Sequence, residues 1–162
     1  MTDASHDTPN VVIFPPLIPL SVLVVGAALN FFMPLGLLAH ALLPGRIVVG
    51  AIAFVIGIGM VIGANRLFQR IGTNARPSKP TLALATSGMF TWTRNPMYVG
   101  GSLALLGIAI GFALDWVILL LAVSLPLVHY GIIRREERYL EGKFGDEYRR
   151  YKTNVPRYWW RF

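Results

Sequence analysis

The chain has 162 residues, of which 54% are hydrophobic and only 14% charged, and it carries a formal net charge of +7. A soluble domain holds about 25% charged residues, so a mean hydropathy of +0.55 argues against that class. Cysteine is absent, which excludes disulfides and thiolate metal sites and leaves the redox compartment open.

The N-terminal leader, MTDASHDTPN, contains acidic residues but neither Lys nor Arg. A secretory signal peptide begins with a basic region, so we expect the apolar segment that follows to remain as a membrane span. Four prolines near its start predict that the chain enters this span through a broken or interfacial segment: Pro9, Pro15, Pro16 and Pro19.

Long uncharged segments make up much of the remaining chain. Residues 47–65, 95–114 and 116–133 contain no Asp, Glu, Lys or Arg. A helix that crosses a bilayer needs about 20 such residues. The sequence therefore predicts an all-α integral membrane protein with four transmembrane helices, at roughly 17–39, 46–65, 96–113 and 115–134, followed by cytoplasmic C-terminal helices. Tight turns are expected at 42–46, between the first two spans, and at Leu114–Asp115.

The distribution of basic residues predicts the orientation. Of the 15 Lys and Arg, five lie between the second and third spans and nine follow the fourth, which leaves only Arg46 for the opposite side. By the positive-inside rule, the middle loop and both termini are cytoplasmic. Attraction to anionic lipid headgroups accounts for the net charge, so no nucleic-acid partner is implied.

Local patterns predict further detail. The spacing of Gly59 with Gly63, and of Gly107 with Gly111, is typical of close helix packing in membranes. The segment 81–90, TLALATSGMF, is partly apolar and is expected to be ordered against the bundle.

The chain after the fourth span should continue as helix. Its apolar face is formed by residues at helical spacing: Leu140, Phe144, Tyr148 and Tyr151. A break is expected at Gly142–Gly145, and Pro156 should end the second helix. The terminal RYWWRF has the composition of an interfacial anchor.

The segment TRNPMY, residues 93–98, opens the third span. Asn95 suits an N-cap and Pro96 suits a first helical residue. The free N–H groups there favour a carboxylate or phosphate, Arg94 adds a cation, and Tyr98 can present its hydroxyl at the same place. A simple helix cap with a snorkelling Arg explains the same residues.

Two further groups are candidates for chemistry. Glu136 and Glu137 point about 100° apart on a helix, so one can face the bundle while the other faces water. Ion pairing with Arg134, Arg135 and Arg138 on a solvated helix is the alternative. His129, seven residues before Glu136, is either a proton acceptor or a hydrogen-bonding partner of a neighbouring helix. The scattered histidines give little support for a metal site, and nucleotide-binding glycine motifs are absent.

Two stretches, TSGMFTWTRNPMYVGG (86–101) and RREERYLEGKFGDEYRRYKTNVPR (134–157), together resemble the isoprenylcysteine carboxyl methyltransferase family, which is itself related to phospholipid N-methyltransferases. The resemblance implies an integral-membrane enzyme that binds S-adenosylmethionine from the cytoplasmic side and takes a lipophilic substrate from the membrane. It divides the chain into residues 1–64, the tail and first two spans, and 65–162, a methyltransferase core.

The resemblance also implies roles for individual residues. Glu136 takes the place of the acid that binds the cofactor, and Arg94 is the candidate catalytic residue, orienting an acceptor carboxylate. The other implied cofactor-binding residues are Leu82, Ala83, Leu84, Ala85, Phe90, Asn95, Pro96, Met97 and Tyr98.

Three positions depart from the family pattern. Asn95 stands where His is usual, Phe90 where Tyr is usual, and Ile132 where the prenylcysteine enzymes carry a substrate-contacting Arg. The last departure weakens the case for a prenylated C-terminus as substrate. The acceptor atom therefore stays open between a carboxylate oxygen, an amine and a thiol. The alternatives are an NADPH-dependent membrane reductase of the sterol-reductase type and a non-catalytic lipid-binding protein.

Overall fold

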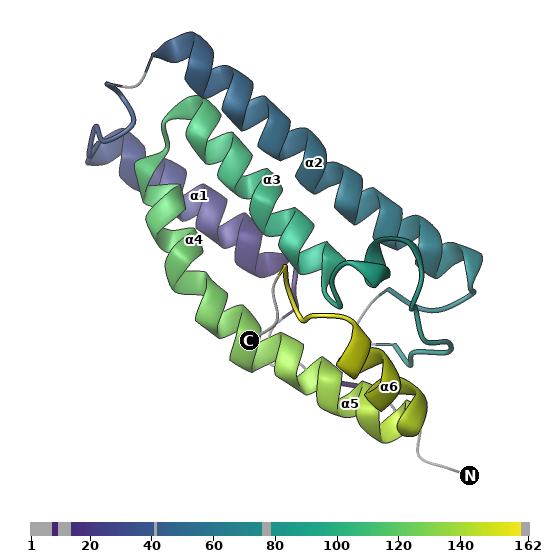
Figure 1. Cartoon of the computed structure of the whole chain (residues 1–162). Coiled ribbons are helices and arrows are strands. Elements are labelled where there is room, and N and C mark those ends of the chain that lie inside the picture. The colour runs from purple at the N-terminus through teal and green to yellow at the C-terminus, as the bar shows by residue number, and fades with distance from the viewer. Residues whose placement is uncertain (1–7, 10–13, 41, 76–78, 160–162) are drawn as a thin grey trace.

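The computed structural model describes residues 8–9, 14–40, 42–75 and 79–159, and its regular elements there are all helical. Four helices lie side by side in an up-and-down arrangement (Figure 1): α1 (Leu17–Phe32), α2 (Leu43–Arg70), α3 (Pro96–Phe112) and α4 (Asp115–Val128). α3 packs along α2, while α1 packs mainly against α4. The all-α prediction is confirmed.

The fourth helix continues past the predicted end of its span at residue 134, as expected. After α4 the chain forms a π-helical turn, His129–Ile133, and continues directly into α5 (Arg134–Phe144). Pro126 lies inside α4 and has no N–H to donate, a defect that is commonly relieved by local rearrangement of the helix. A single π turn shifts every later side chain around the helix axis, and such turns are frequent at functional sites.

The C-terminal helices follow the predicted pattern. Gly145 adopts a positive φ of 53° and separates α5 from α6 (Asp146–Asn154), which ends two residues before Pro156. The predicted terminal anchor lies partly outside the described residues, because residues 160–162 are not among them.

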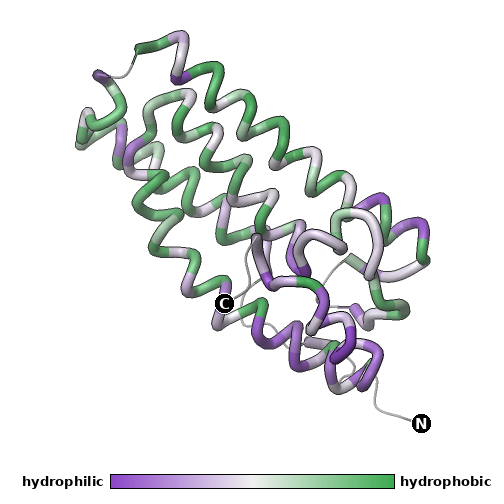
Figure 2. Tube along the Cα trace, in the orientation of Figure 1, coloured by the Kyte–Doolittle hydropathy of each residue, from purple (hydrophilic) through white to green (hydrophobic). Residues whose placement is uncertain are grey.

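Within the part of the chain that the structure describes, two helices are long and apolar enough to cross a membrane: α2 and the continuous helix Asp115–Phe144. α1 and α3 are apolar but shorter. Hydrophilic residues gather at one end of the bundle, where α2 ends and α5 and α6 lie (Figure 2), and we call this the polar end. Elsewhere large apolar side chains face outward, among them Phe31 at 81% exposure and Val55 at 67%, as expected of a surface in contact with lipid.

The connection between α1 and α2 differs from the prediction. α1 ends at Phe32 instead of residue 39, because Pro34 disfavours helix in the residue before it. Pro44 lies in the first turn of α2, where its missing N–H costs nothing, so the link is formed by residues 33–42 rather than 42–46. α2 also continues past residue 65 to Arg70.

A buried carboxylate anchors this link to the start of α4, at the end of the bundle opposite the polar end. Asp115, 4% exposed, accepts hydrogen bonds from the N–H groups of Leu37 at 2.9 Å and Leu38 at 3.1 Å. The tight turn predicted at Leu114–Asp115 is confirmed, since Ala113 adopts a left-handed conformation between α3 and α4.

α2 and α3 approach so closely that their backbones touch at glycines. A Cβ on Gly107 would lie 2.5 Å from the Gly50 carbonyl oxygen, and one on Gly100 would lie 2.6 Å from that of Gly57. The predicted close packing of helices at small residues is confirmed for Gly107, which contacts α2. Gly59, in contrast, has nothing within 4 Å of a built Cβ. The contact glycines of α2 recur every seven residues rather than every four.

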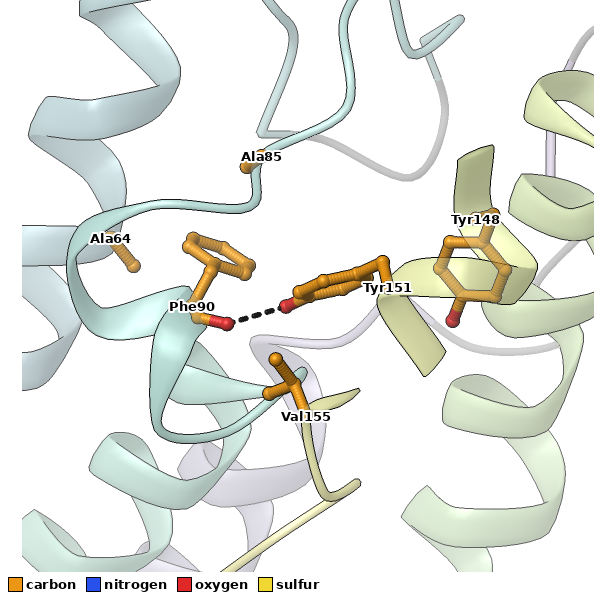
Figure 3. Packing of buried hydrophobic residues seen from close by; sticks show 6 residues of the cluster. All are labelled: Ala64, Ala85, Phe90, Tyr148, Tyr151 and Val155. Atoms are coloured by element: carbon orange, nitrogen blue, oxygen red, sulfur yellow. Dashed lines mark hydrogen bonds between the residues drawn. The ribbon is translucent and has the colours of Figure 1, made fainter. Parts of the chain in front are cut away.

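Near the polar end, residues from α2, the α2–α3 loop and α6 form a buried cluster (Figure 3): Ala64, Ala85, Phe90, Tyr148, Tyr151 and Val155. The Tyr151 hydroxyl donates a hydrogen bond of 2.7 Å to the Phe90 carbonyl oxygen. Leu140 and Phe144 pack against the cluster, which confirms the predicted apolar face of the C-terminal helices. The segment 81–90 is ordered against the bundle, as predicted.

We expect Gly107→Ala to destabilise the protein by about 1–3 kcal/mol, because the added methyl must separate two backbones that are in contact. Gly59→Ala adds the same methyl in open space and should leave the unfolding transition unchanged or raise it slightly. Thermal unfolding of both variants in detergent measures the difference. Equal transitions would show that the glycine contact does not limit the approach of α2 and α3.

Candidate active site

A cavity of about 730 Å³ lies at the polar end, bounded by the starts of α1 and α3, the α2–α3 loop, α4, α5 and α6. Of the candidate residues, Leu82 does not line it, since its side chain is 65% exposed. The other ten do: Ala83, Leu84, Ala85, Phe90, Arg94, Asn95, Pro96, Met97, Tyr98 and Glu136. The fold thus brings together residues that are more than fifty positions apart in the sequence.

The Tyr98–Glu136 pair is the polar centre of the cavity wall. The Tyr98 hydroxyl, in the first turn of α3, donates a hydrogen bond of 2.7 Å to Glu136 Oε1 in α5. This leaves Oε2 of a half-buried carboxylate available to a cation or hydrogen-bond donor in the cavity. A carboxylate in this position is costly without such a partner, so it is a candidate binding group.

The start of α3 contributes backbone donors. The first intrahelical hydrogen bond runs from Val99 N–H to the Asn95 carbonyl, so helix geometry leaves the N–H groups of Met97 and Tyr98 without an intrahelical acceptor. Asn95 occupies the N-cap position but makes no capping bond with its side chain, contrary to prediction. Its amide instead donates 3.1 Å to the Arg157 carbonyl oxygen.

Three hydrogen bonds hold the chain before α3 to the segment after α6. The Arg94 N–H donates 2.9 Å to the Pro156 carbonyl, and the Thr93 hydroxyl donates 2.8 Å to that of Arg157. Together with the Asn95 amide, these bonds satisfy polar groups that are otherwise buried, since Thr93 is 1% exposed and Asn95 8%. Residues Thr93–Asn95 therefore hold the segment after α6 against the start of α3 by hydrogen bonds.

Glu137 lies at the centre of a buried ion cluster. Its Oε1 is 3.0 Å from Arg94 Nη1, and its Oε2 is 2.7 Å from Arg157 Nη2. The side chains of Arg94 and Glu137 are 8% and 10% exposed. The expectation that one of the two adjacent glutamates faces water is wrong: Glu136 lines the cavity and Glu137 is buried. The two partners described here, Arg94 and Arg157, lie outside the helix that carries Glu137.

This cluster shapes the electrostatics of the cavity wall. Two guanidinium groups surround one carboxylate, and within the described residues Arg94 Nε is buried without a hydrogen-bond partner. Burial raises the pKa of the Tyr148 phenol, and the charge of Glu137 raises it further while Arg94 opposes this. Tyr148, which lines the cavity, is therefore neutral.

His129 does not share the cavity face with Glu136. Its Nδ1 lies 2.7 Å from the Tyr158 hydroxyl, and it is not among the cavity-lining residues. A spacing of seven residues keeps two side chains on one face only in an unbroken α-helix, and the π turn at His129–Ile133 interrupts this one. His129 is a hydrogen-bonding residue, as one of the two readings expects, but its partner lies in the segment after α6 and not in a neighbouring helix.

The α2–α3 loop is held in place by side chains from both sides. Thr73 accepts hydrogen bonds from the N–H groups of Leu82 at 2.9 Å and Ala83 at 3.2 Å. The Thr81 N–H donates 3.1 Å to the Tyr139 hydroxyl of α5. Leu82 thus positions its neighbours through its backbone, while its side chain points away from the cavity.

Sequence reasoning missed several residues of the site. The sequence does not single out Arg157 or Tyr139, and it leaves open which of Glu136 and Glu137 faces the bundle. No local signal marks them, because their partners lie 20 to 58 positions away in the sequence. For the start of α1 the sequence predicts only an interfacial entrance to the membrane, yet in the structure Phe14 and Ile18 line the cavity.

We expect Glu137→Gln to lower the stability by about 3–5 kcal/mol, because it leaves two guanidinium groups close together without their shared anion. Glu141→Gln is the matched control, because it removes a partly exposed carboxylate of the same helix that pairs with Arg149 and Lys152. Its unfolding transition should stay close to that of the unmodified protein. If both variants unfold alike, the buried cluster does not hold the C-terminal segment in place.

Comparison with known proteins agrees with this geometry. Residues 45–147 match the family described as phospholipid methyltransferase. A protein of Haemophilus influenzae, described as uncharacterized, is 41% identical over 70 residues, which cover 43% of this chain and 86% of that protein. No solved structure matches. The motifs at 86–101 and 134–157 had indicated a relative of this family, whereas nothing in the comparisons names the prenylcysteine enzymes. The chain belongs to the phospholipid methyltransferase family and is an S-adenosylmethionine-dependent methyltransferase.

Proposed function

We propose that S-adenosylmethionine binds in the cavity beside the Tyr98–Glu136 pair, and that a lipid receives its methyl group there. The hydrogen bond between Tyr98 and Glu136, across 38 positions of sequence, is the observation that carries the proposal. It presents a carboxylate inside a cavity that also contains backbone donors and a guanidinium group. These are complementary to a ligand with a cationic and an anionic end.

The residues of the cavity fit the two ends of the cofactor's amino-acid part. Glu136 suits the ammonium and sulfonium charges, while the N–H groups of Met97 and Tyr98 suit the carboxylate. The backbone at Ala83, Leu84 and Ala85, with Phe90, forms an apolar wall suited to a flat base. Phe90 is 7% exposed and packs on Phe68 with centroids 5.2 Å apart, which fixes this wall.

The cofactor supplies a methyl group on a sulfonium, whose carbon–sulfur bond breaks as the bond to the acceptor forms and whose sulfur leaves as a neutral thioether. The protein's part is to bind, orient and exclude water. Arg94, held at 3.0 Å from Glu137, is a fixed cation that orients an anionic group of the acceptor. The acceptor itself is a lipid, and we leave its reactive atom open between oxygen, nitrogen and sulfur.

We further propose that all four helices cross the membrane, with both termini and the polar end in the cytoplasm. The support is the position of basic residues: five of the 15 Lys and Arg lie between residues 66 and 94, nine follow residue 133, and only Arg46 lies near the opposite end, at the start of α2. α1 and α3 are short for a full crossing, but interfacial residues at their ends can make up the length.

Two other functions make different predictions. A membrane reductase of the sterol-reductase type would bind NADPH stoichiometrically at the same cavity. A non-catalytic lipid-binding protein would bind neither cofactor and would tolerate loss of the Glu136 carboxylate. The family assignment favours methyl transfer over both.

Calorimetric titration of S-adenosylmethionine into the detergent-purified protein should show saturable binding. Glu136→Gln should weaken it at least about tenfold, because a charge-assisted hydrogen bond contributes about 1.5–3 kcal/mol. Tyr98→Phe, which frees the carboxylate but removes its orienting donor, should weaken it less. Glu141→Gln should bind as the unmodified protein does. Saturable NADPH binding without S-adenosylmethionine binding would contradict the proposal.

Arg94→Ala should lower methyl transfer to ethanolamine phospholipid in vesicles by about 10²–10³-fold, the usual effect of removing one fixed electrostatic group. Cofactor binding should be retained within a few fold. Arg94→Lys keeps a positive charge but lacks the planar guanidinium, so it tests whether the geometry of the group or only its charge is needed. Thermal unfolding of each variant, measured in parallel, shows whether a loss of turnover comes from a loss of stability. Unchanged turnover in a folded Arg94→Ala protein would remove Arg94 from the mechanism.

A further inference from the structure

The cavity extends away from the Tyr98–Glu136 pair toward the apolar part of the bundle. Its wall there is formed by Phe14 and Ile18 at the start of α1, Gly101 on α3, and Leu121, Ser124 and Val128 on α4. We call this part the apolar arm. It contains no charged side chain among those residues, in contrast to the polar end of the same cavity.

The helices that line the arm with one face are the same helices whose other faces form the apolar outer surface of the bundle. Gly101 follows Tyr98 by one turn of α3, so a ligand group beside Tyr98 is adjacent to the arm. On α4, Leu121, Ser124 and Val128 share one face, while Val123 between them is 66% exposed on the outside. The arm therefore connects the charged part of the cavity to the level of the protein that faces lipid.

The start of α1 lies outside the residues that match the family, 45–147. It nevertheless completes the arm, since α1 packs against α4 and its first turn places Ile18 in the cavity wall. The prolines Pro15, Pro16 and Pro19 hold this first turn in a defined conformation with few accessible alternatives. One wall of the cavity thus belongs to this chain and not to the matched region.

We infer that the apolar arm holds the hydrocarbon part of the acceptor lipid, and that the start of α1 sets which hydrocarbon chains are accepted. This inference rests on the proposed function. The occupant follows from the chemistry of the wall: an uncharged arm beside a cationic and anionic centre fits a molecule with a polar head and an apolar tail. The polar end takes the head and the reacting atoms, and the arm takes the tail.

Gly101 provides a steric test. A Cβ at Gly101 has nothing within 4 Å, so a larger side chain can enter the arm without moving the backbone. Gly59 on α2 also has nothing within 4 Å and does not line the cavity. Gly101→Leu and Gly59→Leu are therefore matched: both place a leucine in open space within a helix, and only the first places it in the arm.

The probe is ethanolamine phospholipid in mixed micelles, compared with dihexanoyl and with dipalmitoyl chains. Gly101→Leu should raise the apparent KM for the dipalmitoyl lipid about tenfold or more and that for the dihexanoyl lipid less, with calorimetric cofactor binding unchanged. Gly59→Leu should leave all three quantities as they are. Equal KM values for the two glycine variants, in folded proteins, would overturn the inference.

A second pair tests the role of α1. Ile18→Ala should reduce the discrimination between lipids with straight and branched chains, because it widens the arm. Leu20→Ala, on an outward position 56% exposed, should keep it. Unchanged discrimination in Ile18→Ala would remove the start of α1 from substrate selection. Failure of the unmodified protein to bind S-adenosylmethionine would instead contradict the proposed function, so the two failures are distinguishable.

Discussion

The ion cluster at Glu137 is the interaction on which the polar end of the molecule depends. One buried carboxylate holds Arg94, just before α3, and Arg157, after α6, while its own helix continues from α4. Removing it would leave the buried Arg94 guanidinium without its anion, beside the partly exposed Arg157. The cluster therefore fixes three segments against one another, and the cavity wall that contains Tyr98 and Glu136 is formed as a consequence.

The bundle itself is held by contacts of another kind. In lipid there is no hydrophobic drive between helices, so close backbone approach and van der Waals packing must supply the association. Gly50 against Gly107 and Gly57 against Gly100 provide it along α2 and α3. At the opposite end, Asp115 closes the α1–α2 link by accepting two backbone N–H groups. These contacts place the start of α3, and with it the cavity, relative to the α2–α3 loop.

The π turn at His129–Ile133 has a specific consequence for the site. An unbroken helix would bring His129 and Glu136 to one face. The interrupted helix directs His129 to Tyr158 while Glu136 lines the cavity and Glu137 meets the arginines. Both adjacent glutamates can then be turned inward, one toward the cavity and one into the ion cluster. A regular helix periodicity read from the sequence predicts a different arrangement.

The sequence by itself determined the all-α class, the four apolar segments, the break at Gly145 and the family motifs, because each depends on local composition, chain conformation or spacing. It also indicated ten residues that line one cavity, since the resemblance relates positions that fold together. Only the tertiary structure decided the partners of Glu137, the hydrogen bonds of Thr93 and Asn95 to the Arg157 carbonyl, and the place of Ile18 in the cavity wall. These contacts join residues distant in sequence, and no local pattern encodes which buried charge meets which.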